Sequence, residues 1–122
     1  MAGSVSIERP ARSTALRAYA GEIRAEPQLV FAALESAVRA ASADAGIAVD
    51  PSDRFLVVQG NWWYRAEYRV LPADTGSRIE HEVLNVGAKA HWAAPLAARR
   101  VLADSPVAFG RLLTALAHDL EH

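Results

Sequence analysis

The chain contains no cysteine, a single lysine (Lys89) and no apolar run long enough to span a bilayer. Without cysteine there can be no disulfide framework and no thiol chemistry. A membrane-spanning helix needs about 20 consecutive apolar residues, so no membrane insertion is expected. The first residues also lack the apolar core of a secretory signal peptide, and we therefore expect a cytoplasmic protein.

An excess of charge is missing as well, since the formal net charge is −1 over 122 residues. Such a chain has no long-range attraction for nucleic acid, so that partner is not expected. There is no glycine-rich phosphate loop and no nucleophilic-serine motif, and we expect no cofactor. The length fits one globular domain, residues 13–122, preceded by a flexible arm of small and polar residues, 1–12.

Alternation of apolar and charged residues is strongest between residues 55 and 87. Successive side chains of a strand point to opposite faces, so this pattern predicts a three-stranded meander with one inner and one solvated face. The strands are expected at 55–59, 62–70 and 78–86. On the inner face we place Trp62, Tyr64, Ala66, Tyr68 and Val70 of the middle strand and Ile79, His81, Val83 and Asn85 of the last.

Gly60 and Asn61 are typical of a two-residue hairpin loop between the first two of these strands. That loop would set Gln59 opposite Trp62 and Val57 opposite Tyr64, so that Phe55, Val57 and Gln59 face inward. The outer face would then expose an apolar patch of Leu56, Val58 and Trp63. Patches of this kind usually mark contacts, so we expect a homodimer interface there or a covering by the N-terminal arm.

The remaining elements complete an α+β fold. A strand is expected at 13–24, and Glu26-Pro27 predicts the start of a helix whose apolar stripe runs from Val30 to Ala41. Residues 47–53 lead back into the sheet. An alanine-rich helix is expected at 93–103, and Ser105-Pro106 predicts the start of a new helix with Ser105 as its cap. Its core stripe comprises Phe109, Leu112, Leu113, Leu116 and Leu120.

The order strand, helix, antiparallel meander and long C-terminal helix resembles the helix-grip fold of the START-domain and pollen-allergen superfamily. Above all it resembles small bacterial polyketide cyclase/dehydrase-like members. The matching segments are Glu22–Pro27 with Val30–Leu34, Val58–Tyr68 and Glu82–Val86. The resemblance implies a curled antiparallel sheet, here of four to five strands, wrapped on the C-terminal helix. Members bind lipids, polyketides and other apolar small molecules, and only some are enzymes.

A ligand site is therefore expected between the sheet and the last helix, where apolar walls and a few polar groups converge. Its predicted residues are Val57, Gln59, Tyr64, Tyr68, His81, Val83, Asn85, Phe109 and Leu113. His81 titrates near neutrality and Tyr68 can donate a proton, so together they could promote a cyclisation or dehydration. The same residues fit a purely structural role, because buried polar groups normally find hydrogen-bond partners. Catalytic residues are thus not assigned.

His118 and His122 have the spacing of two zinc ligands on a helix, but Asp119 stands where such a motif has glutamate and no third ligand is evident. We expect no metal site. Two functions stay open: binding of an apolar small molecule, with or without acid–base chemistry, and a non-catalytic interaction or dimerisation module with a filled core. A void between sheet and C-terminal helix would favour the first.

Overall fold

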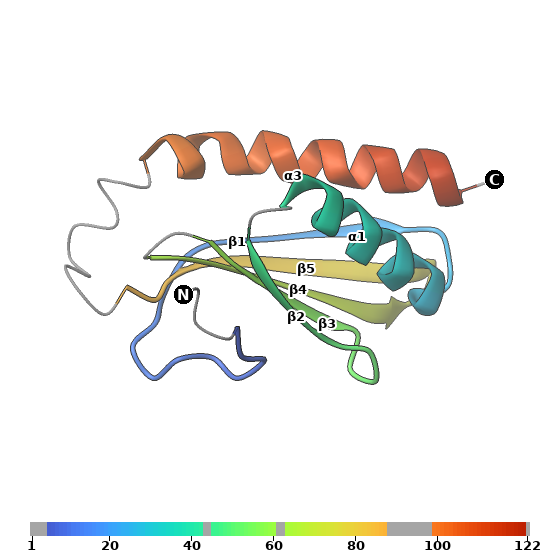
Figure 1. The fold of residues 1–122 in the computed structure, drawn as a ribbon. Helices are drawn as coiled ribbons and strands as arrows, with labels where there is room; N and C mark the ends of the chain where they lie inside the picture. Colours follow the sequence, from blue (N-terminus) through green and yellow to red (C-terminus); the bar gives the residue numbers. More distant parts are fainter. Residues whose placement is uncertain (1–4, 43–44, 61–62, 88–98, 122) are drawn as a thin grey trace.

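The computed structural model describes residues 5–42, 45–60, 63–87 and 99–121. They form a five-stranded antiparallel sheet in the order β1-β5-β4-β3-β2, with two helices on one face (Figure 1). The strands are β1 (Thr14–Ile23), β2 (Gly46–Asp50), β3 (Phe55–Gln59), β4 (Tyr64–Ala73) and β5 (Gly76–Asn85), and the helices are α1 (Pro27–Ala41) and α3 (Arg99–Leu120). The predicted α+β helix-grip arrangement, an unclosed curled sheet with a long C-terminal helix, is confirmed.

The core lies between the helices and the sheet. α1 begins at Pro27 because proline at the first helical position loses no hydrogen bond. The buried side chains of α1 are Val30, Phe31, Leu34 and Val38, as its sequence pattern predicts. They pack with Leu56, Val58, Ala66, Val70 and Ile79 of the sheet and with Phe109 and Leu116 of α3. Each fully buried aliphatic side chain contributes roughly 1.5–3 kcal/mol. No helix of the described residues is long and apolar enough to cross a membrane.

α3 is one continuous helix through Pro106, so the predicted helix start at Ser105-Pro106 is wrong. Proline inside a helix leaves the carbonyl four residues earlier without its N–H donor. Here that carbonyl belongs to Leu102, and the hydroxyl of Ser105 donates to it at 3.2 Å. The serine that resembles a cap therefore replaces the missing backbone bond. Residues 93–98 of the predicted preceding helix lie outside the described residues.

The predicted register of β3 on β4 is also wrong. Gln59 pairs with Arg65, Val58 with Ala66 and Leu56 with Tyr68. The N–H of Gly60 donates to the carbonyl of Tyr64 at 3.2 Å, so the loop is longer than two residues. Asn61 and Trp62 lie outside the described residues. Because side chains alternate along a strand, the altered pairing moves every β3 residue to the opposite face.

The apolar patch predicted on the outer face is consequently part of the interior. Leu56 and Val58 belong to the main core, and Trp63 packs with Val83, Leu16 and Leu102. All three are buried, with at most 4 % of their surface exposed. Trp63 precedes β4, so it need not follow the alternation of the strand. The apolar surface predicted for a homodimer is therefore not exposed, and the oligomeric state stays a prediction.

β4 and β5 are joined by a two-residue turn that requires glycine at its end. Ala73 pairs with Gly76, and Gly76 has a φ of +140°. A Cβ at this position would lie 2.7 Å from the carbonyl oxygen of Ile23 and 2.7 Å from the backbone nitrogen of Ala25. The end of β1 thus approaches the turn more closely than a side chain allows, which ties β1 to the hairpin.

We expect Gly76→Ala to lower the free energy of unfolding by roughly 1–3 kcal/mol, because it combines a strained φ with a backbone clash. Gly110→Ala is the matched control. Gly110 is an exposed α3 residue, and a Cβ added there would meet no atom within 4 Å, so alanine should stabilise the helix by about 0.5–1 kcal/mol. Urea denaturation of both variants measures the difference, and equal midpoints would contradict the turn geometry.

Candidate functional site

A cleft of about 390 Å³ lies between α1, α3 and the helix-facing side of β4 and β5. Its sheet side is formed by Tyr64, Tyr68 and His81. α1 contributes Ala37, Val38, Ala41 and Ser42, and α3 contributes Val101, Asp104, Ser105, Ala108, Phe109 and Leu112. Most of these side chains are apolar and several are small, so the lining leaves space for a molecule between the helices and the sheet.

A stack of aromatic rings forms the floor of the cleft. Tyr68 and His81 are paired across β4 and β5, and their rings are 4.2 Å apart and nearly parallel at 7°. Tyr19 of β1 stacks on the other side of His81 at 5.8 Å, and Phe109 of α3 contacts His81 at 5.4 Å. Three neighbouring strands thus place one ring each in a row. Packing on both sides holds the His81 ring in one orientation.

The proton of His81 is located by its one hydrogen bond. Nδ1 lies 3.2 Å from the backbone carbonyl of Glu67, and since a carbonyl only accepts, Nδ1 carries the hydrogen. Nε2 is then an acceptor. Burial lowers the pKa of His81 to about 4, although the Glu67 carbonyl partly opposes this shift. His81 is therefore a neutral ring with a fixed tautomer at pH 7.

Two polar atoms of the floor have no hydrogen-bond partner among the residues that the structure describes. Within the described residues, neither the Tyr68 hydroxyl nor Nε2 of His81 makes a hydrogen bond. Every fully buried side-chain polar atom of these residues has a hydrogen-bond partner, so these two unbonded atoms are not fully buried. They are therefore open to the cleft that their residues line. Burial raises the pKa of Tyr68, so its hydroxyl stays protonated. The floor offers one donor and one acceptor without net charge.

The Tyr19 hydroxyl, in contrast, is bonded to the protein. It donates to Oγ of Ser105, whose own hydrogen is given to Leu102. The bond connects β1 to the middle of α3 beside Pro106. It fixes the edge of the cleft where α3 lies over the aromatic stack.

We expect Tyr19→Phe to lower the free energy of unfolding by about 1 kcal/mol, since it removes a hydrogen bond between β1 and α3. Tyr68→Phe should change it by less than about 0.5 kcal/mol, because the lost hydroxyl has no protein partner. Thermal unfolding of the two isosteric variants provides the comparison. A larger loss for Tyr68→Phe would mean that its hydroxyl has a structural role.

Four of the nine predicted site residues line the cleft: Tyr64, Tyr68, His81 and Phe109. Val83, Asn85 and Leu113 are on the helix side of the sheet but serve packing. Val83 packs against Trp63, the Asn85 side chain accepts from the N–H of Gly87, and Leu113 occupies the space left by Gly21. The predicted inward placement of Val57 and Gln59 is wrong, because the β3 register puts both on the opposite face of the sheet from the cleft.

Sequence reasoning misses the α1 wall and the polar residues of α3. Ala37 and Ala41 belong to the apolar stripe predicted for α1, and their small size is the available signal for a space above them. Asp104 and Ser105 have the composition of a helix start. Tyr19 has the same parity as Ile23 in β1, yet the many alanines of that strand obscure the alternation.

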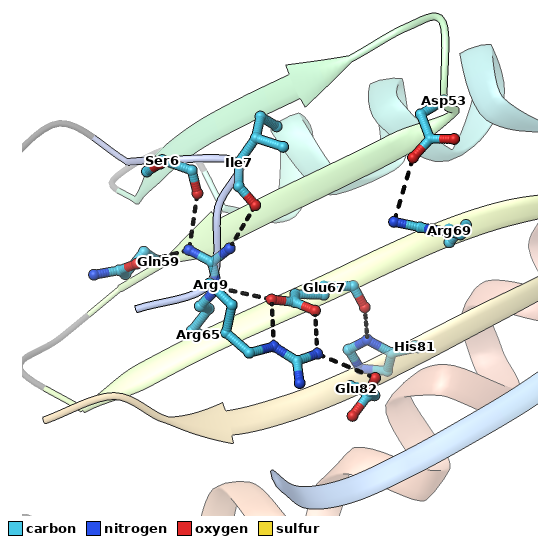
Figure 2. Close-up of polar contacts among 10 residues, drawn as sticks. All are labelled: Ser6, Ile7, Arg9, Asp53, Gln59, Arg65, Glu67, Arg69, His81 and Glu82. Atoms are coloured by element: carbon cyan, nitrogen blue, oxygen red, sulfur yellow. Dashed lines mark hydrogen bonds and ion pairs between the residues drawn. The ribbon is translucent and has the colours of Figure 1, made fainter. Parts of the chain in front are cut away.

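On the outer face of the sheet the N-terminal arm lies over Arg65 and Glu67 of β4, so this part is not the solvated face expected (Figure 2). Arg65 is fully buried there. It donates to the carbonyls of Ser6 and Ile7 at 2.9 and 3.1 Å, and to the side chains of Glu67 and Gln59 at 2.9 and 3.3 Å. Four of the five N–H donors of this buried guanidinium are thus bonded to acceptors of the protein. The sequence-based view holds only for pairs such as Arg78–Glu80, which is half exposed.

Glu67 completes the attachment of the arm. Its carboxylate is 2.6 Å from the guanidinium of Arg9 and 2.9 Å from that of Arg65. Burial pushes the pKa of Glu67 upward, but the hydrogen bonds and charges of the two arginines outweigh this and hold the pKa below its usual value.

A groove of about 460 Å³ beside the arm is lined largely by charged residues, including Asp53 and Arg69, which pair at 3.4 Å. The inner cleft is therefore the stronger candidate site.

We expect Glu67→Gln to lower the free energy of unfolding by about 3 kcal/mol at pH 7, because Arg65 stays buried without its anion. The folded-state pKa of Glu67 is lowered, so this stabilisation is present above the unfolded pKa of about 4.5 and is lost as pH falls through the folded value. Denaturation from pH 7 to pH 3 should show the two curves converging. Glu80→Gln, at an exposed pair, should cost no more than about 0.5 kcal/mol, and equal losses would contradict this account.

None of the protein-family models, curated proteins or solved structures compared with the chain matches it. Membership of the helix-grip superfamily thus stays a prediction, and the fold and the cleft are the basis for function. No cluster of three or more potential metal ligands occurs among the described residues, and His122 lies outside them.

Proposed function

We propose that this chain binds an apolar, ring-containing small molecule in the cleft between α1, α3 and the sheet. The observation that carries the proposal is the pair of unpartnered polar atoms, the Tyr68 hydroxyl and His81 Nε2, on the floor of an otherwise apolar cleft. Binding sites for small molecules generally combine apolar walls with a few placed polar groups. A volume of about 390 Å³ lies within the range of about 300–1,000 Å³ that is usual for small-molecule sites.

Binding without catalysis fits the electrostatics better than acid–base chemistry does. Proton transfer is efficient when the pKa of the catalytic group lies near the working pH. Burial moves the pKa of His81 down to about 4 and that of Tyr68 upward, so both depart from neutrality in opposite directions. The pair is suited to orienting a ligand through hydrogen bonds. The alternative of a dimerisation module loses support, because the patch expected to mediate it is buried. The cytoplasmic location stays a prediction.

A fluorescence titration with the neutral probe N-phenyl-1-naphthylamine tests the proposal. The probe brightens in apolar surroundings, so wild-type protein should enhance its emission in a saturable manner. Ala108→Leu places a larger side chain in the cleft wall and should weaken binding on the order of tenfold, which corresponds to about 1.4 kcal/mol.

Ala103→Leu is the matched control, since Ala103 is exposed on the same helix and does not line the cleft. Its affinity should equal that of the wild type. Equal weakening in both variants, or no saturable enhancement with the wild type, would refute binding in the cleft.

A further inference from the structure

The two polar atoms of the cleft floor differ in the hydrogen-bond role that they require of a ligand. His81 Nε2 can only accept a hydrogen bond, because the hydrogen of the neutral ring is held on Nδ1 by the carbonyl of Glu67. Its neighbour Tyr68 has a hydroxyl that can donate. The rings are stacked at 4.2 Å, so both groups address the same part of a bound molecule.

The charges at the cleft further restrict the class of ligand. Among the described lining residues Asp104 alone carries a charge, and no arginine or lysine is present. A carboxylate ligand would find no cation to pair with. It would meet the lone pair of His81 and the anion of Asp104 in a partly desolvated site, where an unpaired charge is costly.

We infer that the ligand is a neutral hydroxylated ring compound, a phenol or cyclic alcohol, whose O–H donates to Nε2 of His81 while its oxygen accepts from the Tyr68 hydroxyl. This inference rests on the proposed function and names the ligand class of the same cleft. An apolar molecule without a donor leaves His81 Nε2 unsatisfied once water is displaced. Leaving a buried acceptor unpaired generally costs more than a hydrogen bond contributes net.

The packing of the cleft floor fixes Nε2 of His81 as the acceptor, so the ligand must supply the donor. His81 is held between Tyr68 and Tyr19 and is covered by Phe109, so its ring cannot turn to present Nδ1. Rotation would also remove the only donor that reaches the Glu67 carbonyl from this ring. A fixed acceptor selects for a donor on the ligand more strongly than a hydroxyl does, because a hydroxyl can rotate to serve either role.

The test uses three naphthalenes of nearly equal shape, titrated into the full chain and followed by NMR chemical shifts. They are 2-naphthol, which donates and accepts, 2-methoxynaphthalene, which only accepts, and 2-naphthoate, an anion. We expect 2-naphthol to bind at least tenfold more tightly than 2-methoxynaphthalene, although the ether is the more apolar compound, and 2-naphthoate to bind most weakly.

Two variants assign the selectivity to residues. His81→Phe keeps a stacked ring but removes the acceptor, so the preference for naphthol over the ether should fall to about twofold or less. Asp104→Lys supplies a cation at the cleft and should raise the affinity for 2-naphthoate on the order of tenfold. Both variants are checked for a folded-state spectrum. Should His81→Phe not fold, Tyr68→Phe replaces it and should reduce the affinity for both neutral compounds equally.

The outcomes separate the inference from the function on which it rests. If the ether binds as tightly as naphthol, or if the preference persists in His81→Phe, the hydroxyl requirement is wrong while cleft binding stands. If naphthoate binds best to the wild type, the neutral-ligand class is wrong. If none of the three naphthalenes and no N-phenyl-1-naphthylamine binds, the proposed function itself falls, and the inference falls with it.

Discussion

The pairing of Gln59 with Arg65 determines what each face of the sheet contains. With this register β3 sends Leu56 and Val58 into the core and leaves Val57 and Gln59 beside Arg65 on the other side. A slip of one residue would exchange these sets, since side chains alternate along a strand. Gln59 would then face the helices, and Arg65 would lose the Gln59 side-chain oxygen to which it donates at 3.3 Å. The contribution of Leu56 and Val58 to the core and the bond between Gln59 and Arg65 both depend on this alignment.

Glu67 links the outer face of the sheet, where the arm binds, to the cleft on the inner face. Its carboxylate holds Arg9 and Arg65 on the outer face, whereas its backbone carbonyl holds Nδ1 of His81 (Figure 2). The side chain therefore attaches the arm, and the main chain fixes the histidine tautomer. A buried ion pair often adds little net stability compared with apolar packing, but removing one partner leaves a costly unpaired charge. Here the Arg65–Glu67 pair fixes the position of β4, on which both the arm contacts and the hydrogen bond to His81 depend.

Sequence alone suffices where the alternation is local and fails where partners are distant. Tyr68 and His81 are placed correctly because apolar and charged residues alternate regularly in β4 and β5. The run Phe55–Val58 is apolar throughout and all four residues are buried, so the sequence pattern of β3 fits either register. The role of Ser105 in bonding Leu102 is equally hidden, because a serine before proline has the composition of a helix start.

The strand order also decides when the sheet can be completed. β2 to β5 follow one another in sequence and pair as successive hairpins, whereas β1 at residues 14–23 pairs only with β5 at residues 76–85. β1 therefore leaves the ribosome long before its partner exists, and closing that separation carries a loop-entropy cost that the hairpins do not. Its ten residues are an unpaired strand edge during synthesis, a state prone to association with other chains. The first strand made is the last to be protected.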